Sequence, residues 1–407
     1  MSNDILNDQL ALEGGQKIRE DFLVFMSPII EQEAIDSVVD SLKSGWVGTG
    51  PKNKQFAQDI SEFLNIKHVQ LVNSCTAALH LSMISLGIGP GDEVIAPTMT
   101  FCATVNSILF TGAKAVLVDC DYDSMNVTRE LIEKQITDKT KAVVVVHMAG
   151  LPIDLDPIKD LCKARGLYLI EDAAHAFESK YKNQYTGTIG DMGCYSFYAT
   201  KNLTTAEGGA FVTNNEKYYN TAAQASLHGM SVDAYKRFST TGFKHYDVSM
   251  LGYKYNLTDI QAALGIAHLK KIYDYLKVRE EIWLSYNEGL KDLPVILPAE
   301  IPDSFKEGSL HARHLYVLRF DLDKLTKDRD YILDAIQAEG IGCGIHYKPV
   351  HEHSYYVNEL GYKANDFPNA HKIGQELLSL PLSPKMTAQD TKDVIAAVRK
   401  VVKALEK

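Results

Sequence analysis

Short, wholly apolar runs alternate with amphipathic segments in the first half of the chain, and this alternation restricts the possible folds more than any other feature. The apolar runs are 69–72, 93–96, 115–118, 142–147 and 167–170. The segments between them have helical spacing and cover 75–86, 102–111, 128–136 and 155–165. Strands that are apolar throughout predict a parallel or mixed sheet with helices on both faces. We therefore expect an α/β fold whose ligands collect beyond the carboxyl ends of the strands.

The residues before this region predict an arm and two further helices. Residues 1–26 have no clear periodicity, and helices are expected from Pro28 to Leu42 and from Lys54 to Leu64. The glycine-rich stretch 46–51 lies between these helices. No strand precedes it and it lacks the G-x-G-x-x-G spacing, so it does not predict a dinucleotide-binding loop or a nicotinamide-dependent enzyme.

The second half of the chain predicts a smaller α+β unit. A polar, irregular region (214–250) is followed by a long helix (258–288) and a linker (293–298). After the linker we expect a strand (314–320), a helix (328–339), a second strand (341–347) and a terminal helix (388–405). We expect an N-terminal arm (1–26), a large domain (27–270), and a long linking helix with a small C-terminal domain (271–407).

Composition excludes several classes of protein. With 407 residues, 45% of them hydrophobic, the chain is long enough for two domains, and its net charge of −10 argues against nucleic acid or an anionic membrane as the main partner. No apolar run could span a bilayer, and the N-terminus lacks the features of a signal peptide. The six cysteines are scattered without metal-binding spacing, so we expect no metal site and a cytoplasmic, reduced protein.

Lys201 is the strongest candidate for chemistry. It lies between the apolar runs 193–195 and 210–213, five residues after Ser196. A lysine held between two buried strands loses hydration, which lowers the pKa of its amine and makes it a nucleophile. Such lysines form Schiff bases with carbonyl compounds, pyridoxal phosphate among them. The alternative is a solvated loop lysine, and only the surrounding residues decide between the two.

Two other strand ends carry candidate cofactor ligands. Ser74, Cys75 and Thr76 close one strand and open a helix, where hydroxyls and free N–H groups suit a phosphate ester. An ordinary helix cap is the alternative. Phe101 follows the next strand and could stack on a flat cofactor ring, or could be a core residue.

A third strand end carries two acids and a histidine. Glu171 and Asp172 follow the buried run 167–170, and a buried carboxylate there requires a cation. The protonated ring nitrogen of pyridoxal phosphate would be such a cation, although a helix cap is the alternative. His175 could orient the carboxylate or fill space. The phosphate cradle, aromatic, acid and lysine together are the protein parts that a pyridoxal phosphate site needs.

With this set of residues, the chain resembles the DegT/DnrJ/EryC1/StrS sugar aminotransferase family, a branch of the fold-type I pyridoxal phosphate enzymes. The resemblance runs from about Leu23 to near the C-terminus. The motifs that carry it are SGWVGTGP, NSCTAALH, GDEVIAPTMTFCAT, EDAAHAFES, SFYATKNLTTAEGG, HGMSVDAY (228–235), GYKYNLTDIQAALG and HYKPVHEHSYY. Within the family, the pattern is most similar to the members that make UDP-4-amino-4-deoxy-L-arabinose. The fold expected from the resemblance has a mainly parallel sheet covered by helices and a smaller C-terminal α+β domain.

The resemblance implies a role for each candidate. Lys201 would hold the cofactor as a Schiff base and shuttle protons, Asp172 would pair with the ring nitrogen, and His175 would lie beneath the ring. Asn256 would reach the phosphate of a neighbouring subunit, giving a homodimer with shared active sites. The phosphate would be held by Ser74, Cys75, Thr76 and Ser196.

The resemblance also implies the reaction. It is the transfer of an amino group from L-glutamate, which leaves as 2-oxoglutarate, to a nucleotide-diphosphate keto-sugar, with UDP and C4 favoured. The product would serve cell-surface polysaccharide or lipopolysaccharide synthesis. Alternatives are a 4-keto-6-deoxy sugar substrate and a regulator that binds the cofactor without catalysis. Family members that dehydrate sugars carry His at the position of Lys201, so this chain falls with the transaminases.

Two departures from the pattern bear on specificity. Phe101 stands where the L-arabinose members have Trp, so stacking is expected to survive while the preferred substrate shape differs. Ala206 stands where many members have Gly. On the sugar side, His314, His346, Tyr347 and Lys348 could face the substrate, although exposed loop positions would explain them equally well.

Overall fold

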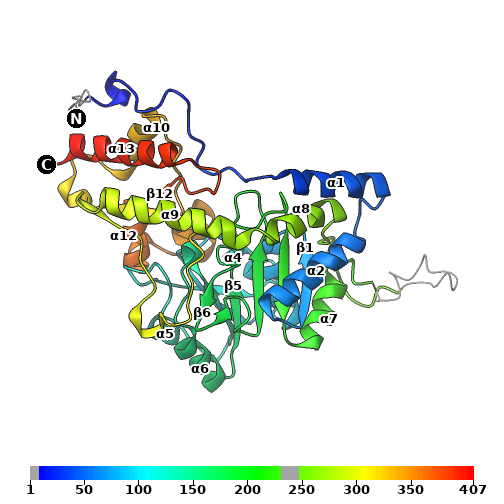
Figure 1. Cartoon of the computed structure of the whole chain (residues 1–407). Helices are drawn as coiled ribbons and strands as arrows, with labels where there is room; N and C mark the ends of the chain where they lie inside the picture. The colour runs from blue at the N-terminus through cyan, green and yellow to red at the C-terminus, as the bar shows by residue number, and fades with distance from the viewer. Residues whose placement is uncertain (1–8, 231–246) are drawn as a thin grey trace.

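A seven-stranded sheet forms the centre of the computed structural model, which describes residues 9–230 and 247–407 (Figure 1). The strand order is β1-β9-β8-β5-β4-β2-β3, and β9 alone runs antiparallel to its neighbours. The strands are β1 (His68–Val72), β2 (Glu93–Pro97), β3 (Lys114–Val118), β4 (Thr140–Val146), β5 (Tyr168–Asp172), β8 (Met192–Ser196) and β9 (Gly209–Thr213). This mainly parallel sheet confirms the predicted fold class.

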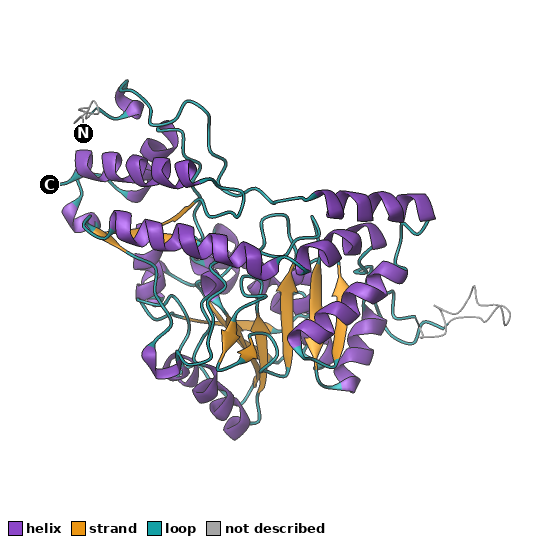
Figure 2. Ribbon diagram, in the orientation of Figure 1, coloured by secondary structure: helices purple, strands orange, loops and turns teal. Residues whose placement is uncertain are grey.

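Helices cover both faces of the sheet, as Figure 2 shows. They are α1 (Gln32–Ser44), α2 (Pro51–Leu64), α3 (Cys75–Ser85), α4 (Cys102–Leu109), α5 (Arg129–Glu133), α6 (Leu155–Arg165), α7 (Glu216–Ala225) and α8 (Asp259–Leu269). Buried side chains surround α3 on all sides because it packs between the sheet and the helices α4 and α7. A short hairpin, β6 (Lys180–Tyr181) and β7 (Gln184–Tyr185), leaves the sheet after β5.

A second, antiparallel sheet organises the C-terminal part. It consists of β10 (Val295–Ile296), β11 (Tyr316–Phe320) and β12 (Leu377–Leu380). The helices of this part are α9 (Ile272–Leu290), α10 (Arg329–Ala338), α11 (Ser354–Leu360), α12 (Pro368–Glu376) and α13 (Ala388–Leu405). A separate hydrophobic core, centred on Trp283 and Tyr316, fills the space between α9, α10, α13 and this sheet. The division into domains at residue 270 stays a prediction.

The arm is more ordered than the sequence predicts. Leu10 is buried in the C-terminal core, and the fully buried carboxylate of Glu339 accepts hydrogen bonds from the N–H groups of Ala11 (2.9 Å) and Ile18 (3.1 Å). The ammonium group of Lys400 completes the pairing of this carboxylate. The described residues of the arm are therefore held against the C-terminal part by charge-assisted hydrogen bonds.

Three predicted elements differ in the structure. The helix expected over 258–288 is two helices, because the backbone leaves helical geometry at Lys271 (φ −107°, ψ 3°). The segment 341–347 makes only isolated bridges, from Ile341 to Leu23 and from Gly344 to Ser379. The region 214–250 contains α7, whose start is capped by Asn215. The part of the 228–235 motif from residue 231 onward lies outside the described residues.

Candidate active site

The carboxyl ends of β5 and β8 open onto a cavity of about 390 Å³. Every predicted cofactor and catalytic residue except Asn256 lines it, together with residues of the C-terminal part that include His314, His346 and Tyr347. Parallel strands bring their carboxyl ends to one edge of a sheet, which explains why residues far apart in sequence meet here. Across the described residues, no group of three or more His, Cys, Asp or Glu side chains could hold a metal ion.

Lys201 reaches this cavity from the turn after β8. The turn is closed by the backbone N–H of Lys201, which donates to the carbonyl of Tyr198 (2.9 Å). Burial of the amine lowers the pKa of Lys201 to about 8, with Cys75 and Asp172 opposing the shift. Near neutral pH, a larger fraction of the amine is therefore unprotonated than in an ordinary lysine.

The carboxylate of Asp172 is buried beside the lysine. It accepts hydrogen bonds from the hydroxyl of Thr104 (2.8 Å) and the N–H of Ala174 (3.1 Å). Burial raises the pKa of Asp172, and the structure gives it no salt bridge within the described residues. Thr104, which lies in the first turn of α4, was missed by the sequence analysis because a helix threonine carries no distinctive signal.

Glu171 points to the opposite face of the sheet, as adjacent strand residues must. Its fully buried carboxylate accepts from the ring Nε2 of His147 (3.0 Å) and from the N–H groups of Gly187, Ile189 and Gly190. Burial acts to raise its pKa, but these hydrogen bonds hold the pKa below its ordinary value. Of the two acids, Asp172 alone faces the cavity, and Glu171 fixes the 187–190 loop.

Ser74, Cys75, Thr76 and Ser196 gather at one end of the cavity. The hydroxyl of Ser74 accepts from the N–H of Ala77 (3.1 Å) and so caps α3, which leaves the remaining N–H groups of the first turn for a ligand. Gly209 lies directly beneath, where a Cβ atom would come within 2.6 Å of the backbone of Ser74 and Cys75. Glycine at 209 thus allows β9 to approach the start of α3 closely.

Aromatic side chains form the opposite wall. Phe101 is 54% exposed and contacts the ring of Tyr347 with centroids 5.6 Å apart, so it is a cavity residue and not a core residue. His175 accepts from the N–H of Ala149 at Nδ1 (3.2 Å), which leaves its Nε2–H to donate to the hydroxyl of Tyr347 (3.0 Å). Burial lowers the pKa of His175 well below its usual value, so the ring is neutral.

The residues considered for the sugar side separate into two groups. His314, His346 and Tyr347 line the cavity, whereas Lys348 is exposed and does not. His346 stacks on Phe25, and burial lowers its pKa to about 4. These side chains come from irregular segments after α9, whose approach to the sheet the sequence pattern does not determine.

Asn256 lies near the site but not in its lining. Its amide donates to the hydroxyl of Thr49 (2.7 Å), and its backbone pairs with Val72 at the end of β1. Ala206, the other departure from the family pattern, has a φ of 68°, in the left-handed region where glycine is favoured.

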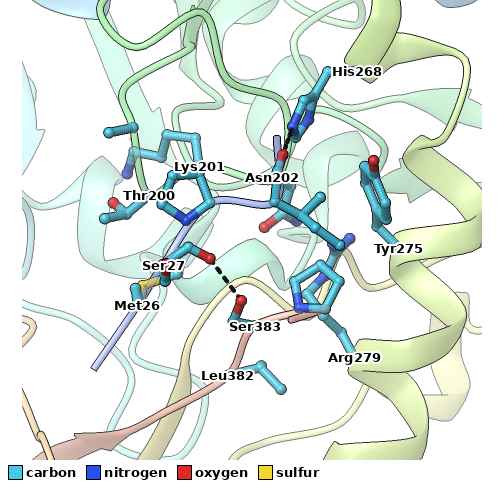
Figure 3. Close-up of a pocket in the computed structure, with 14 residues that line it drawn as sticks. Met26, Ser27, Thr200, Lys201, Asn202, His268, Tyr275, Arg279, Leu382 and Ser383 are labelled. Carbon is cyan, nitrogen blue, oxygen red and sulfur yellow. Dashed lines mark hydrogen bonds between the residues drawn. The ribbon is translucent and has the colours of Figure 1, made fainter. Parts of the chain in front are cut away.

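A second, smaller cavity adjoins Lys201 (Figure 3). It measures about 20 Å³ and is lined by residues that include Asn202, His268, Tyr275 and Arg279. A volume of this size holds about one water molecule. The larger cavity is therefore the only one of these two that can take a cofactor and a substrate.

A mainly parallel sheet with a partly buried lysine and a buried carboxylate at its carboxyl edge is the arrangement of a pyridoxal-phosphate-dependent aminotransferase of fold type I. Comparison with known sequences agrees. Residues 28–399 match the profile of the DegT/DnrJ/EryC1/StrS aminotransferase family, and the chain belongs to this family.

Relatives and solved structures cover nearly the whole chain. The spore coat polysaccharide biosynthesis protein SpsC of Bacillus subtilis is 43% identical over 389 residues, which are 95% of this chain and 99% of that protein. The putative sugar aminotransferase Spr1654 of Streptococcus pneumoniae is 32% identical in its PLP form, with a TM-score of 0.86 over 94% of this chain and 100% of that one. Helicobacter pylori PseC, an aminotransferase of pseudoaminic acid biosynthesis, is 28% identical with a TM-score of 0.86, covering 95% and 100%.

The residues of the cavity fit the cofactor of this family. The buried carboxylate of Asp172 needs a cation, the end at Gly209 offers N–H groups and hydroxyls to a phosphate, and Phe101 offers an exposed ring face. Among the described residues, no helix is both long and apolar enough to cross a membrane.

Proposed function

We propose that this protein transfers the amino group of L-glutamate to a nucleotide-diphosphate-linked keto-sugar, at C4 of a UDP-linked sugar. The product would supply cell-surface polysaccharide or lipopolysaccharide synthesis. The observation that carries the proposal is a lysine of lowered pKa beside a buried carboxylate in a cavity of about 390 Å³. The naming of SpsC as a spore coat polysaccharide biosynthesis protein supports the pathway class.

Each residue of the site has a part in this proposal. Pyridoxal phosphate supplies an electron sink when bound. Lys201 would anchor it and would serve as the base that moves a proton during transfer, and Asp172 would face its ring nitrogen as the balancing carboxylate. Phe101 would stack on the ring. His175, which burial keeps neutral, would support the site through its hydrogen bond to the hydroxyl of Tyr347. The phosphate is held by Ser74, Cys75, Thr76 and Ser196.

Replacement of the lysine tests the catalytic assignment. Lys201→Ala should lose the visible absorbance of the bound cofactor and all measurable turnover, because no other amine lies in the lining of the cavity described here. Measured turnover in this variant would contradict the assignment.

A panel of sugars tests the substrate. UDP-, dTDP- and GDP-linked 4-keto sugars would each be assayed with glutamate. A preference for a UDP-linked 4-keto pentose is expected. A preference for a 4-keto-6-deoxy sugar would support the alternative substrate. Phe101 in place of Trp favours this alternative, because the smaller ring leaves more room for the sugar.

The regulator alternative has its own test. A protein that only binds the cofactor would leave it in the aldehyde form when glutamate is added. Conversion to the pyridoxamine form, followed by absorbance, is expected here because Lys201 and Asp172 are both present in the cavity. Spr1654 has been solved in PLP and PMP forms, which supports the same expectation.

We also propose a homodimer with shared active sites that works in the cytoplasm. Several large apolar side chains around α1 and on the loop before α8 are exposed, a pattern typical of an interface: Ile35, Val39, Leu42, Trp46 and Leu251. All six cysteines, each within the described residues, are free thiols, as suits a reducing compartment. Light scattering on the purified protein would give the oligomeric state.

A further inference from the structure

A continuous chain of polar contacts leads from the core of the protein to Lys201. The guanidinium of Arg279 on α9 pairs with the carboxylate of Glu178, and both side chains are almost fully buried. Oε1 of this carboxylate accepts from the amide of Asn202 (2.8 Å). The amide oxygen of Asn202 meets Nδ1 of His314 (3.0 Å), and Nε2 of His314 lies 3.4 Å from the Nζ atom of Lys201.

The acceptors around Asn202 fix the orientation of its amide. Its Nδ2 atom lies within hydrogen-bond distance of two acceptors, the Glu178 carboxylate and the carbonyl of Ala312 (2.9 Å). A flipped amide would place its oxygen against both of them, so the oxygen must face His314. The amide oxygen can only accept, which assigns the ring proton of His314 to Nδ1 and leaves a lone pair on Nε2.

Burial, assisted by neighbouring charged and titratable groups, keeps His314 neutral. Burial lowers its pKa well below the usual value, and Lys201, His175, Arg279 and His346 act in the same direction. His175 is the nearest of the imidazoles, with ring centroids 4.5 Å apart. A neutral ring with its lone pair toward Lys201 is an acceptor and not a competing donor.

We propose that His314 is a positioning residue. Its Nε2 atom accepts a hydrogen bond from the Lys201 amine, so that the lone pair of the amine points into the cavity. Asn202 acts through it by fixing the tautomer, and the Glu178–Arg279 pair fixes Asn202. No bond to Lys201 is formed or broken in this role. The inference rests on the proposed function only in taking Lys201 as the residue that captures the cofactor.

The test measures cofactor capture by the cofactor-free, full-length protein. Pyridoxal phosphate is mixed rapidly with the protein, and the visible absorbance is followed. His314→Leu should slow capture about tenfold, the effect of one lost hydrogen bond on a reacting group. His314→Gln, whose amide oxygen can accept, should recover most of the rate, and Asn202→Leu should give an intermediate loss.

Pyridoxine 5′-phosphate separates positioning from a structural defect. It has the ring and the phosphate but no aldehyde, so its Kd should be unchanged in His314→Leu. A Kd that weakens by the same factor as the capture rate would overturn the proposal. His311→Asn is the control, because His311 is buried but does not line the cavity, and the amide oxygen of asparagine can replace Nδ1 as the acceptor for the N–H of Arg313; its capture rate should equal that of the wild type.

Nuclear magnetic resonance of ¹⁵N-histidine-labelled wild-type protein tests the tautomer without any variant. The Nδ1–H form of His314 is expected, and the Nε2–H form would overturn the inference even if the variants fail to fold. Failure of the proposed function can be distinguished from failure of this inference. Visible absorbance in Lys201→Ala would show that Lys201 is not the residue that captures the cofactor. A slower but complete rise in His314→Leu leaves Lys201 in place and supports the positioning role.

Discussion

The two neighbouring acids, Glu171 and Asp172, should respond in opposite ways to the loss of their charge. Asp172→Asn should lower kcat at least about a hundredfold, the usual effect of losing one preorganised electrostatic group, with little change in melting temperature. Glu171→Gln should leave kcat of the folded enzyme nearly unchanged but destabilise it by about 2 kcal/mol, because a carboxylate that accepts from His147 and three N–H groups becomes partly unsatisfied. Single-turnover kinetics with glutamate and thermal melts measure both effects. A kcat effect confined to Glu171→Gln would reverse the assignment.

The lowered pKa of Lys201 should appear as a pH dependence of stability in the cofactor-free protein. The pKa is about 8 in the folded state against an ordinary value of 10.5, so between these values the unfolded chain binds more protons. Stability then rises with pH through this window, and the penalty for burying the amine is fully present below pH 8.

Lys201→Met removes this titration and serves as the reference, because the tyrosines and the cysteines other than Cys75, whose pKa the amine lowers, titrate similarly in both proteins. The melting temperature of the wild type should gain on that of the variant as the pH rises from 8 to 10.5. A constant difference across this range would show that the amine has an ordinary pKa.

At the scale of single residues, the sequence predicted those site residues that follow a strand of the main sheet. Asp172 and Ser196 end β5 and β8, and Lys201 follows β8 closely, so the edge rule places them together. The same rule says nothing about orientation along a helix or a loop. For this reason Thr104 was missed and His314 was considered only for the sugar side, and the alternatives for Phe101 were settled only by its exposure in the structure.

At the scale of elements, the glycine-rich stretch 46–51 binds a carboxylate of the protein itself. The buried side chain of Asp259, at the start of α8, accepts from the N–H groups of Gly50 (2.7 Å), Lys52 (3.0 Å) and Asn53 (2.9 Å). These are the free N–H groups at the start of α2, which a negative charge stabilises. The contact joins α2 to α8 and explains Gly50 without any nucleotide, because a Cβ atom at this position would come within 2.7 Å of the Asp259 carboxylate.

Asp259→Asn should therefore destabilise the protein by about 1–3 kcal/mol, because one of the two acceptor oxygens becomes a donor facing buried N–H groups. Thermal or urea unfolding measures the change. Asp274→Asn, an exposed carboxylate in the first turn of α9, is the control and should change stability by less than about 0.5 kcal/mol. Equal effects in the two variants would mean that the contact to α2 contributes nothing.

Element boundaries show where local patterns stop being informative. The strands of the main sheet were predicted because each is a short, mainly apolar run, and β2 (Glu93–Pro97) is buried along its whole length. The break between α8 and α9 was missed because Lys270 and Lys271 are ordinary helix residues, and packing alone turns the chain there. The strand β12 (Leu377–Leu380) was missed because three leucines and a serine directly after a helix look like the continuation of that helix.

At the scale of the whole molecule, the cavity depends on how the C-terminal part meets the main sheet. Met26 from the arm and His346 and Tyr347 from beyond β11 line the same cavity as Lys201. Their distance from the lysine along the chain leaves no periodic signal, so a single sequence cannot predict the meeting. Figure 1 shows α9 running between the main sheet and the C-terminal part. Arg279 of α9 lines the smaller cavity together with Asn202.

The proposed homodimer would share each active site between its two subunits. If Lys201 of one subunit and Asn256 of the other serve the same site, Lys201→Ala and Asn256→Ala each remove one of the two residues, contributed by different subunits. Each variant alone is then inactive. A mixed dimer then contains one intact site and one site with both defects. Random pairing makes half of the dimers mixed, so co-expression should restore about a quarter of wild-type activity.

Separate purification of each variant provides the control, since neither homodimer has an intact site. The position of Asn256 supports the design: it lies outside the cavity lining of its own chain, at the end of β1, hydrogen-bonded to Thr49. Activity in the Asn256→Ala homodimer would mean that Asn256 is not needed for the cofactor. No activity in the co-expressed mixture, with mixed dimers verified by two affinity tags, would place both residues in a site of one chain.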